Sequence, residues 1–236
     1  MNQQVPKQPN VWRDPAGYAE GVKQSYRKDY WAMQPNYCEL WCEKDAIIGS
    51  IQELTDELGL TVRVGRGFLS ATRINDIAQH LNSVNKANKT VFYLGDHDPS
   101  GQDIQRAAYH RVQERAGELW ESEREDDRCA DGMTASFKVE RIAIHPEDIT
   151  KFKLPPLRIR TKEDGAYADP RAKTFLRKFA NQCVELDALP PNELRRRIQE
   201  AVESQLDMAL WKRAIEIEEV EIRSIVEAVS AWPGLS

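Results

Sequence analysis

Apolar residues along this chain follow two different spacings, one typical of buried strands and the other typical of amphipathic helices. Short apolar runs bounded by polar and turn residues predict strands at 38–42, 61–64, 90–95 and 136–144. Between these runs, apolar residues recur every three or four positions, which predicts helices at 44–59, 71–84 and 102–120. A strand followed by a helix three times in succession predicts βαβ units, and hence an α/β fold with an open parallel sheet of about four strands flanked by helices.

The segments outside that repeat predict further helices and two loops. Residues 18–31 read as an N-terminal helix, 121–135 and 154–173 as loops, and 192–207 and about twenty later residues as helices. We therefore expect three parts, which are an N-terminal helical extension (1–36), the α/β domain (37–190) and a C-terminal helical tail that packs on it (191–236).

Composition indicates a folded protein, and the sequence also predicts its location in the cell. Hydrophobic residues make up 41% of the 236 positions and charged residues 30%, a balance typical of a globular protein rather than a disordered one. No apolar run approaches the roughly 20 residues of a membrane span. The polar, proline-containing start lacks the basic and apolar regions of a signal peptide. We therefore expect a cytoplasmic protein with no membrane partner.

The four cysteines and the net charge of −5 bear on two possible functions, zinc binding and polyanion binding. Cys38 and Cys42 have no second close pair to complete a zinc site, so they are expected to pack in the core as thiols. A net negative charge argues against a general binder of polyanions, whose affinity comes from neutralising phosphates. It leaves room for a local basic groove and for metal ions that supply positive charge.

Acidic residues follow two of the predicted strands at the point where each strand ends. Glu43 comes directly after the first strand, and Asp96 and Asp98 come after the third. Ligands of open parallel sheets bind outside the carboxyl ends of the strands, so the three carboxylates converge there if the two strands are neighbours. Converging carboxylates repel one another, and a hard divalent cation such as Mg²⁺ relieves that repulsion. The alternative is that Glu43 and Asp96 cap the helices that follow them.

Two similar patterns are excluded. The loop DHDPSG (96–101) matches the early positions of a calcium-binding EF-hand loop, but Ala107 stands where a bidentate glutamate belongs, and a strand rather than a helix precedes it. The segment VGRGFLS contains G-x-G, yet Ser70 occupies the third glycine position of a dinucleotide-binding fingerprint. We expect its glycines to form a tight turn that presents Arg66 toward the acids.

Four segments together resemble one known family. Glu43 after a strand, followed by D-x-D-x-x-G at 96–101, is similar to the Toprim domain of topoisomerases, primases and nucleases of the overcoming-lysogenization-defect kind. The resemblance is closest to the Toprim half of the topoisomerase VI A subunit and of the meiotic double-strand-break protein. It covers roughly 37–190, and its motifs are EKDAI (43–47), GRGFLSATR (65–73), GDHDPSGQDI (95–104) and VELDAL (184–189).

The resemblance implies a metal-dependent site on nucleic acid. It implies Mg²⁺, with Mn²⁺ as a substitute, held by Asp96 and Asp98, while Glu43 completes the metal shell or moves protons. Basic residues over 158–178 suit a DNA backbone, although a solvated charged face is the alternative. For His97 the alternative is an orienting or exposed position. Residues that are candidates for contact with phosphate or DNA are Lys44, Arg66, Arg73, His97, Arg171 and Lys173.

The chain departs from the topoisomerase VI pattern in one respect. Only 42 residues precede Glu43, too few for the winged-helix domain that carries the family's nucleophilic tyrosine. A fragment, a naturally short form and one half of a two-chain enzyme all remain open. Three functions follow as hypotheses. They are a Mg²⁺-dependent nuclease acting on DNA, a topoisomerase- or recombination-type component whose partner protein supplies the tyrosine, and a non-catalytic DNA-binding subunit.

Overall fold

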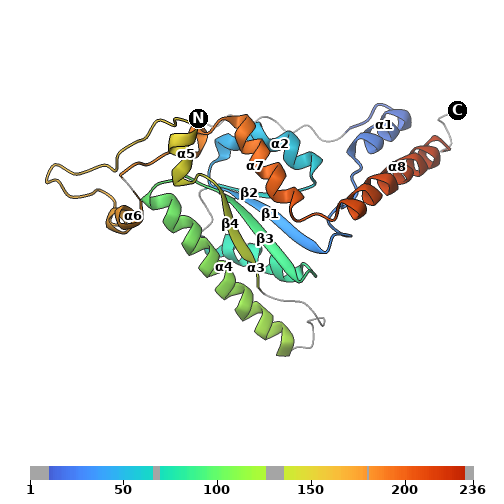
Figure 1. Cartoon of the computed structure of the whole chain (residues 1–236). Coiled ribbons are helices and arrows are strands. Elements are labelled where there is room, and N and C mark those ends of the chain that lie inside the picture. Colours follow the sequence, from blue (N-terminus) through green and yellow to red (C-terminus); the bar gives the residue numbers. More distant parts are fainter. Residues whose placement is uncertain (1–10, 66–69, 126–135, 180, 232–236) are drawn as a thin grey trace. The chain divides into compact units, whose positions relative to one another are not determined.

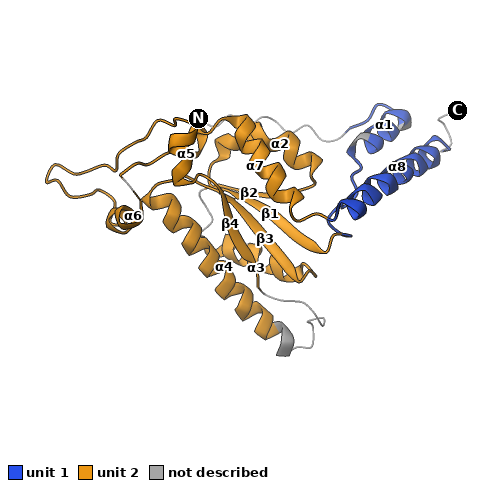
Figure 2. Cartoon of the chain, viewed as in Figure 1, with its two compact units in different colours: residues 1–33, 207–236 blue, residues 34–206 orange. Residues whose placement is uncertain are grey.

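The computed structural model describes residues 11–65, 70–125, 136–179 and 181–231 (Figure 1). The chain forms two compact units (Figure 2). The larger unit spans Gln34–Leu206, and the smaller one joins Met1–Met33 to Asp207–Ser236. The sequence instead placed the limits at 36/37 and 190/191.

A parallel sheet of four strands forms the centre of the larger unit. The strands are β1 (Asn36–Cys42), β2 (Thr61–Val64), β3 (Asn88–Leu94) and β4 (Lys138–Ala143), in the order β2-β1-β3-β4. Every neighbouring pair is parallel, with Cys42 opposite Leu94 in the central pair. The predicted α/β class and open parallel sheet flanked by helices are therefore confirmed.

Helices cover both faces of this sheet (Figure 1). On one face, α3 (Ala71–Ser83) and α4 (Pro99–Glu125) pack together over Trp41 and Tyr93. The other face carries α2 (Ile48–Glu57), which follows a 3₁₀ turn at Asp45–Ile47, and α7 (Pro191–Glu203). Because helices cover both faces, the central strands β1 and β3 are almost continuously buried. Cys38 and Cys42 are buried free thiols, as predicted.

Several element limits differ from the expected ones, and the N-terminal helix α1 covers Pro15–Ser25 instead of 18–31. Helix α4 starts at Pro99, because Asp98 accepts a hydrogen bond from the Gly101 amide and proline suits a first helical turn. It extends to Glu125, beyond the expected end at 120. Helix α6 (Ala172–Lys178) begins inside the segment expected to be an irregular loop. Helix α7 ends at Glu203 instead of 207, since Asp207 caps the next helix by accepting from the amides of Ala209 and Leu210.

The smaller unit pairs helix α1 (Pro15–Ser25) with helix α8 (Met208–Ser230). Tyr26 and Lys28 bond to Glu221, and Tyr30 donates to Glu218. Tyr26 and Tyr30, two of the tyrosines that precede Glu43 in the sequence, therefore connect the segment after α1 to α8. No helix in the described part of the chain combines the length and apolar character that crossing a membrane requires.

A buried ion pair fixes α7 beside the end of β4. Arg197 of α7 donates to both carboxylate oxygens of Asp148, at 2.8 and 2.5 Å, and to the Ile142 carbonyl. Asp148 lies in α5 (Pro146–Lys151), and its side chain is 2% exposed. Burial alone would raise the pKa of Asp148, but the Arg197 guanidinium and the His145 amide lower it below its ordinary value overall.

Asp148→Asn is expected to lower the free energy of unfolding by about 2 kcal/mol at neutral pH, because a charge-assisted hydrogen-bond pair is lost. A depressed pKa contributes stability above the unfolded value of about 3.9, and that stability disappears as the pH falls through the folded value. Urea unfolding at several pH values should therefore show the variant and the native chain converging in acid. Asp76→Asn, at an exposed position of α3, serves as the control and should change little at any pH. An equal effect of both substitutions would contradict a special role for the ion pair.

Candidate active site

The carboxyl ends of β1 and β3 bring Glu43 and Asp96 together. Glu43 directly follows β1, and its amide donates to the Leu94 carbonyl at 3.0 Å, which continues the pairing of the two strands. Its Oε2 atom lies 3.4 Å from the Asp96 amide nitrogen. The expected convergence arises because the two strands are direct neighbours in the sheet.

Burial raises the pKa of both carboxyl groups, and neighbouring aspartates add to the effect. Burial raises the pKa of Glu43 above its ordinary value, and the negative charges of Asp96 and Asp98 raise it further. Burial also raises the pKa of Asp96, although the Leu186 amide and the Lys44 ammonium act in the opposite direction. The charged form of each group is therefore held in an unfavourable environment, which is typical of functional sites.

Only one of the three acids caps a helix. Asp98 accepts a hydrogen bond from the Gly101 amide at 2.6 Å and so caps α4. The Asp96 Oδ1 atom accepts from the Leu186 amide at 2.7 Å, far along the sequence. The capping alternative is therefore wrong for Glu43 and Asp96, whose carboxylates contact backbone amides of other segments.

Lys44 links the acids to a segment that sequence reasoning left out of the site. Its Nζ atom lies 3.3 Å from Asp96 Oδ1, 2.9 Å from Glu185 Oε2 and 3.2 Å from Asp187 Oδ1. Burial alone would lower the pKa of Lys44, but these acids raise it overall. The only sequence signal for Glu185 and Asp187 was the motif VELDAL, noted as part of the resemblance and not as a source of site residues.

Arg141 of β4 is a second cation that the sequence analysis missed. Its guanidinium donates to the backbone carbonyls of Gly95, Asp96 and Gly101 at 2.8, 3.2 and 3.2 Å, and to the Gln105 side chain at 2.7 Å. Arg141 therefore holds the backbone of the acidic loop, residues 95–101, in place. The strand KVERIA also contains Lys138 and Glu140, so Arg141 did not stand out in the sequence.

The donor set suits a hard divalent cation by chemistry, but the present arrangement is not a coordination shell. Mg²⁺ and Mn²⁺ prefer carboxylate oxygens such as those of Glu43, Asp96 and Asp98. Over the described ranges, however, no group of three or more His, Cys, Asp and Glu side chains is placed so that it could hold a metal ion. Asp96 already bonds to Leu186 and Lys44, so binding would require these side chains to rearrange.

The remaining candidates for phosphate contact lie in different settings. Arg73 of α3 donates to the Val64 carbonyl at the end of β2. Arg171 pairs with Asp169 and lies 3.6 Å from Asp103 of α4, and Lys173 is exposed on α6. Arg66 lies outside the described residues.

His97 is buried, so an exposed position is wrong, whereas the packing of its ring agrees with an orienting one. It is 1% exposed, and its ring packs against Phe175 and Phe179 with centroid distances of 5.1 and 4.9 Å. Backbone hydrogen bonds to Val184 hold it there, and burial lowers its pKa. His97 therefore anchors the acidic loop to α6 through packing.

Gly101 lets the acidic loop and the first turn of α4 approach closely. A Cβ atom at this position would overlap the Asp96 backbone carbonyl. Gly101→Ala is therefore expected to destabilise the larger unit by about 1–3 kcal/mol, the typical cost of overpacking, and to displace Asp96. Thermal unfolding measures the first effect.

Gly117→Ala in the same helix provides a matched control. A Cβ at Gly117 meets nothing within 4 Å, so alanine there should stabilise the helix by up to about 1 kcal/mol. If the two variants unfold at the same temperature, the close approach at Gly101 has no energetic importance.

Comparison with known proteins gives no family to which the chain can be assigned. No family model, no curated protein and no solved structure matches it.

Proposed function

We propose that this chain cleaves phosphodiester bonds in nucleic acid, DNA in the first instance, with Mg²⁺ or Mn²⁺ at the cluster of Glu43, Asp96 and Asp98. The observation that supports the proposal most is the pair formed by Glu43 and Asp96. The two acids lie at adjacent strand ends, and burial, reinforced by the negative charge of neighbouring aspartates, raises the pKa of each. The resemblance of the motifs to Toprim domains points to the same chemistry.

The residues of the chain have separable tasks in this proposal. The raised pKa of Glu43 lies closer to neutral pH than that of an ordinary carboxyl group. Glu43 therefore holds or moves a proton at its carboxylate near the attacked phosphate. Lys44 places a positive charge beside Asp96, where it can orient a phosphate oxygen. Asp96 and Asp98 would hold the cation, which supplies positive charge against the charge that develops on the phosphate. Arg141 keeps the loop that carries both aspartates in place.

One observation favours a second function, that of a non-catalytic nucleic-acid-binding subunit. The Lys44 ammonium already pairs with Asp96, Glu185 and Asp187 and offsets part of their negative charge. The described residues also contain no ready metal-holding group. A chain of this kind would keep the acidic loop for its shape and bind nucleic acid without a cation. A cytoplasmic location without a membrane partner belongs to both proposals.

Incubation of the full chain with supercoiled, linear and single-stranded DNA and with RNA tests these functions. We expect at least one substrate to be cleaved with Mg²⁺ or Mn²⁺ and none to be cleaved with EDTA. Absence of cleavage of any substrate by the folded chain would contradict the nuclease proposal. Binding that EDTA leaves unchanged, without cleavage, would favour the subunit. A covalent protein–DNA adduct formed with a second protein would indicate the topoisomerase-type component.

A further inference from the structure

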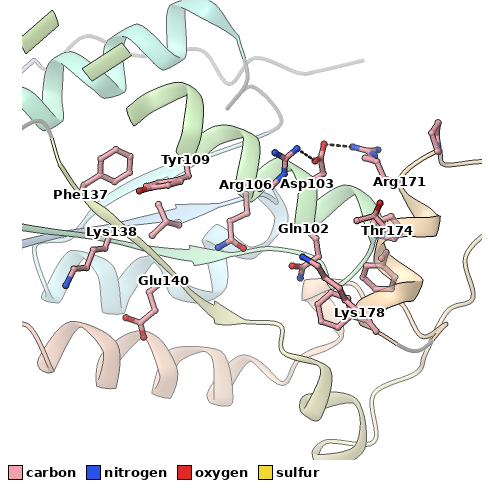
Figure 3. Close-up of a pocket in the computed structure, with 16 residues that line it drawn as sticks. Gln102, Asp103, Arg106, Tyr109, Phe137, Lys138, Glu140, Arg171, Thr174 and Lys178 are labelled. Carbon is pink, nitrogen blue, oxygen red and sulfur yellow. Dashed lines mark hydrogen bonds and ion pairs between the residues drawn. The ribbon is translucent and has the colours of Figure 1, made fainter. Parts of the chain in front are cut away.

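A long groove runs between α4, the edge strand β4 and α6 (Figure 3). Figure 3 shows Phe137, Lys138 and Tyr109 toward one end and Arg171, Thr174 and Lys178 toward the other. The cavity volume is about 1150 Å³, above the roughly 300–1,000 Å³ of most small-molecule pockets. Along α4 its lining extends from Pro99 to Tyr109, which corresponds to about 15 Å at the rise of an α-helix. The size and shape therefore suit an extended occupant.

The groove is cationic although the chain as a whole is acidic. Four lining side chains are basic and two, Asp103 and Glu140, are acidic, whereas the chain carries a net charge of −5. Asp103 lies 2.7 Å from Arg106 and 3.6 Å from Arg171, so it lies between the two guanidinium groups, and Arg171 also bonds to Asp169 at 2.9 Å. Each guanidinium has five N–H donors, and these pairs leave donors for a further anion. The charge thus fits a chain of phosphates.

Aromatic side chains lie among these cations. Tyr109 and Phe179 are half-buried and line the groove, and each ring packs against a second, buried ring. Phe137 packs edge-on against Tyr109 with ring centroids 5.4 Å apart, and Phe175 packs against Phe179 at 5.0 Å. Rings of this kind in a basic groove are typical of sites that stack unpaired bases. A duplex offers no free base faces, because its bases are stacked on one another.

The groove begins next to the acidic cluster, although Glu43, Asp96 and Asp98 do not themselves line it. Pro99, which lines it, directly follows Asp98, and α6 lines it next to the ring of His97. We propose that this groove binds a single strand of nucleic acid, with its phosphates on Arg106, Lys138, Arg171 and Lys178 and with bases against Tyr109 and Phe179. The direction of the strand toward Asp98 rests on the proposed function, whereas the binding itself does not.

Fluorescence anisotropy of the full chain with a labelled oligothymidylate, in EDTA, tests the inference without cleavage. We expect the single strand to bind more tightly than a duplex of equal length. Lys138→Gln combined with Lys178→Gln should weaken binding roughly tenfold. It should also reduce the slope of log K against log salt by about 1.4, because two phosphate contacts on a single strand are lost. Both lysines are exposed, so the fold should be preserved.

Lys151→Gln combined with Lys153→Gln is the matched control. It makes the same chemical change at two exposed lysines that neither line the groove nor belong to the basic stretch 158–178, and should leave the affinity within about twofold. Tyr109→Leu keeps apolar bulk but removes the stacking face, and should weaken binding by about tenfold. Thermal unfolding of each variant identifies any that has lost its fold.

Three outcomes would overturn the inference. They are equal affinity for duplex and single strand, equal weakening by the control pair, and effective competition by a poly-glutamate peptide, which would assign the groove to acidic protein segments. Failure of the proposed function looks different. Binding that depends on the groove without any cleavage contradicts the nuclease proposal alone, and cleavage that the groove variants leave unchanged contradicts the groove alone.

Discussion

Glu43→Gln is expected to abolish nucleic-acid cleavage and at the same time to raise the thermal unfolding midpoint. Loss of a positioned acid–base group typically costs at least about a hundredfold in rate. The gain in stability has a separate cause. The native structure holds the Glu43 carboxylate in a buried position near the charges of Asp96 and Asp98, and glutamine removes one of the repelling charges while keeping the shape.

The pH dependence of that gain follows from the direction of the pKa shift. A carboxyl whose pKa is raised in the folded state contributes stability below its unfolded pKa, near 4.3, and this contribution is lost as the pH rises through the folded value. The stability advantage of Glu43→Gln should therefore be present at neutral pH and disappear in acid, where the native glutamic acid is also uncharged.

Thermal unfolding followed by circular dichroism between neutral and acidic pH measures this difference, and cleavage assays run beside it. Glu53→Gln makes the same chemical change at an exposed position of α2 and should alter neither quantity. A Glu43→Gln variant that cleaves normally would show that Glu43 takes no part in the cleavage reaction. A variant that is less stable than the native chain at neutral pH would show that the carboxylate is not under repulsion.

The sheet could be predicted from sequence because burial on both faces leaves a clear signal. The central strands β1 and β3 read as short apolar runs, and TVRV at 61–64 coincides with β2. Helix α6 gives no such signal. Only Ala172 and Phe175 of its seven residues are buried, too few to give a helical periodicity, and three of the other five are charged.

The acids of the site were predictable for the same reason, whereas their partners were not. Glu43 and Asp96 follow apolar strands directly, and parallel pairing places such residues side by side. Lys44 meets Glu185 across 141 positions and Asp187 across 143, and no local pattern records a contact of that range. An exposed position was one alternative for His97, and its burial depends on the contacts with Val184 and α6, which are also distant in sequence.

The segment 185–187, far along the sequence from Glu43 and Asp96, therefore completes the site. The Leu186 amide bonds to Asp96, and the acids on either side of it bond to Lys44. These contacts orient Asp96 and offset part of the negative charge of the cluster. The resemblance named this segment as a motif, and the contacts show what it does structurally.

Arg141→Met is expected to cause the largest loss of stability, about 3 kcal/mol or more. Arg141 is partly buried, and methionine fills much of its space but donates no hydrogen bond. The Asp96 carbonyl would lose a donor, and Glu43 and Asp96 would lose a nearby positive charge. Removing one partner from a buried charged network typically costs 3–5 kcal/mol, because the remaining charges are left uncompensated.

Arg141→Lys separates the charge from the geometry. Lysine keeps the positive charge but cannot form the planar fork that reaches the Gly95, Asp96 and Gly101 carbonyls together, so an intermediate loss is expected. Urea unfolding at constant m-value measures both variants, with Arg158→Met at an exposed position as the control. The loss in Arg141→Met should shrink in acid, where Glu43 and Asp96 become neutral and no longer need the cation. If it is equally large at every pH, the hydrogen bonds to the loop, and not the charge, account for the role of Arg141.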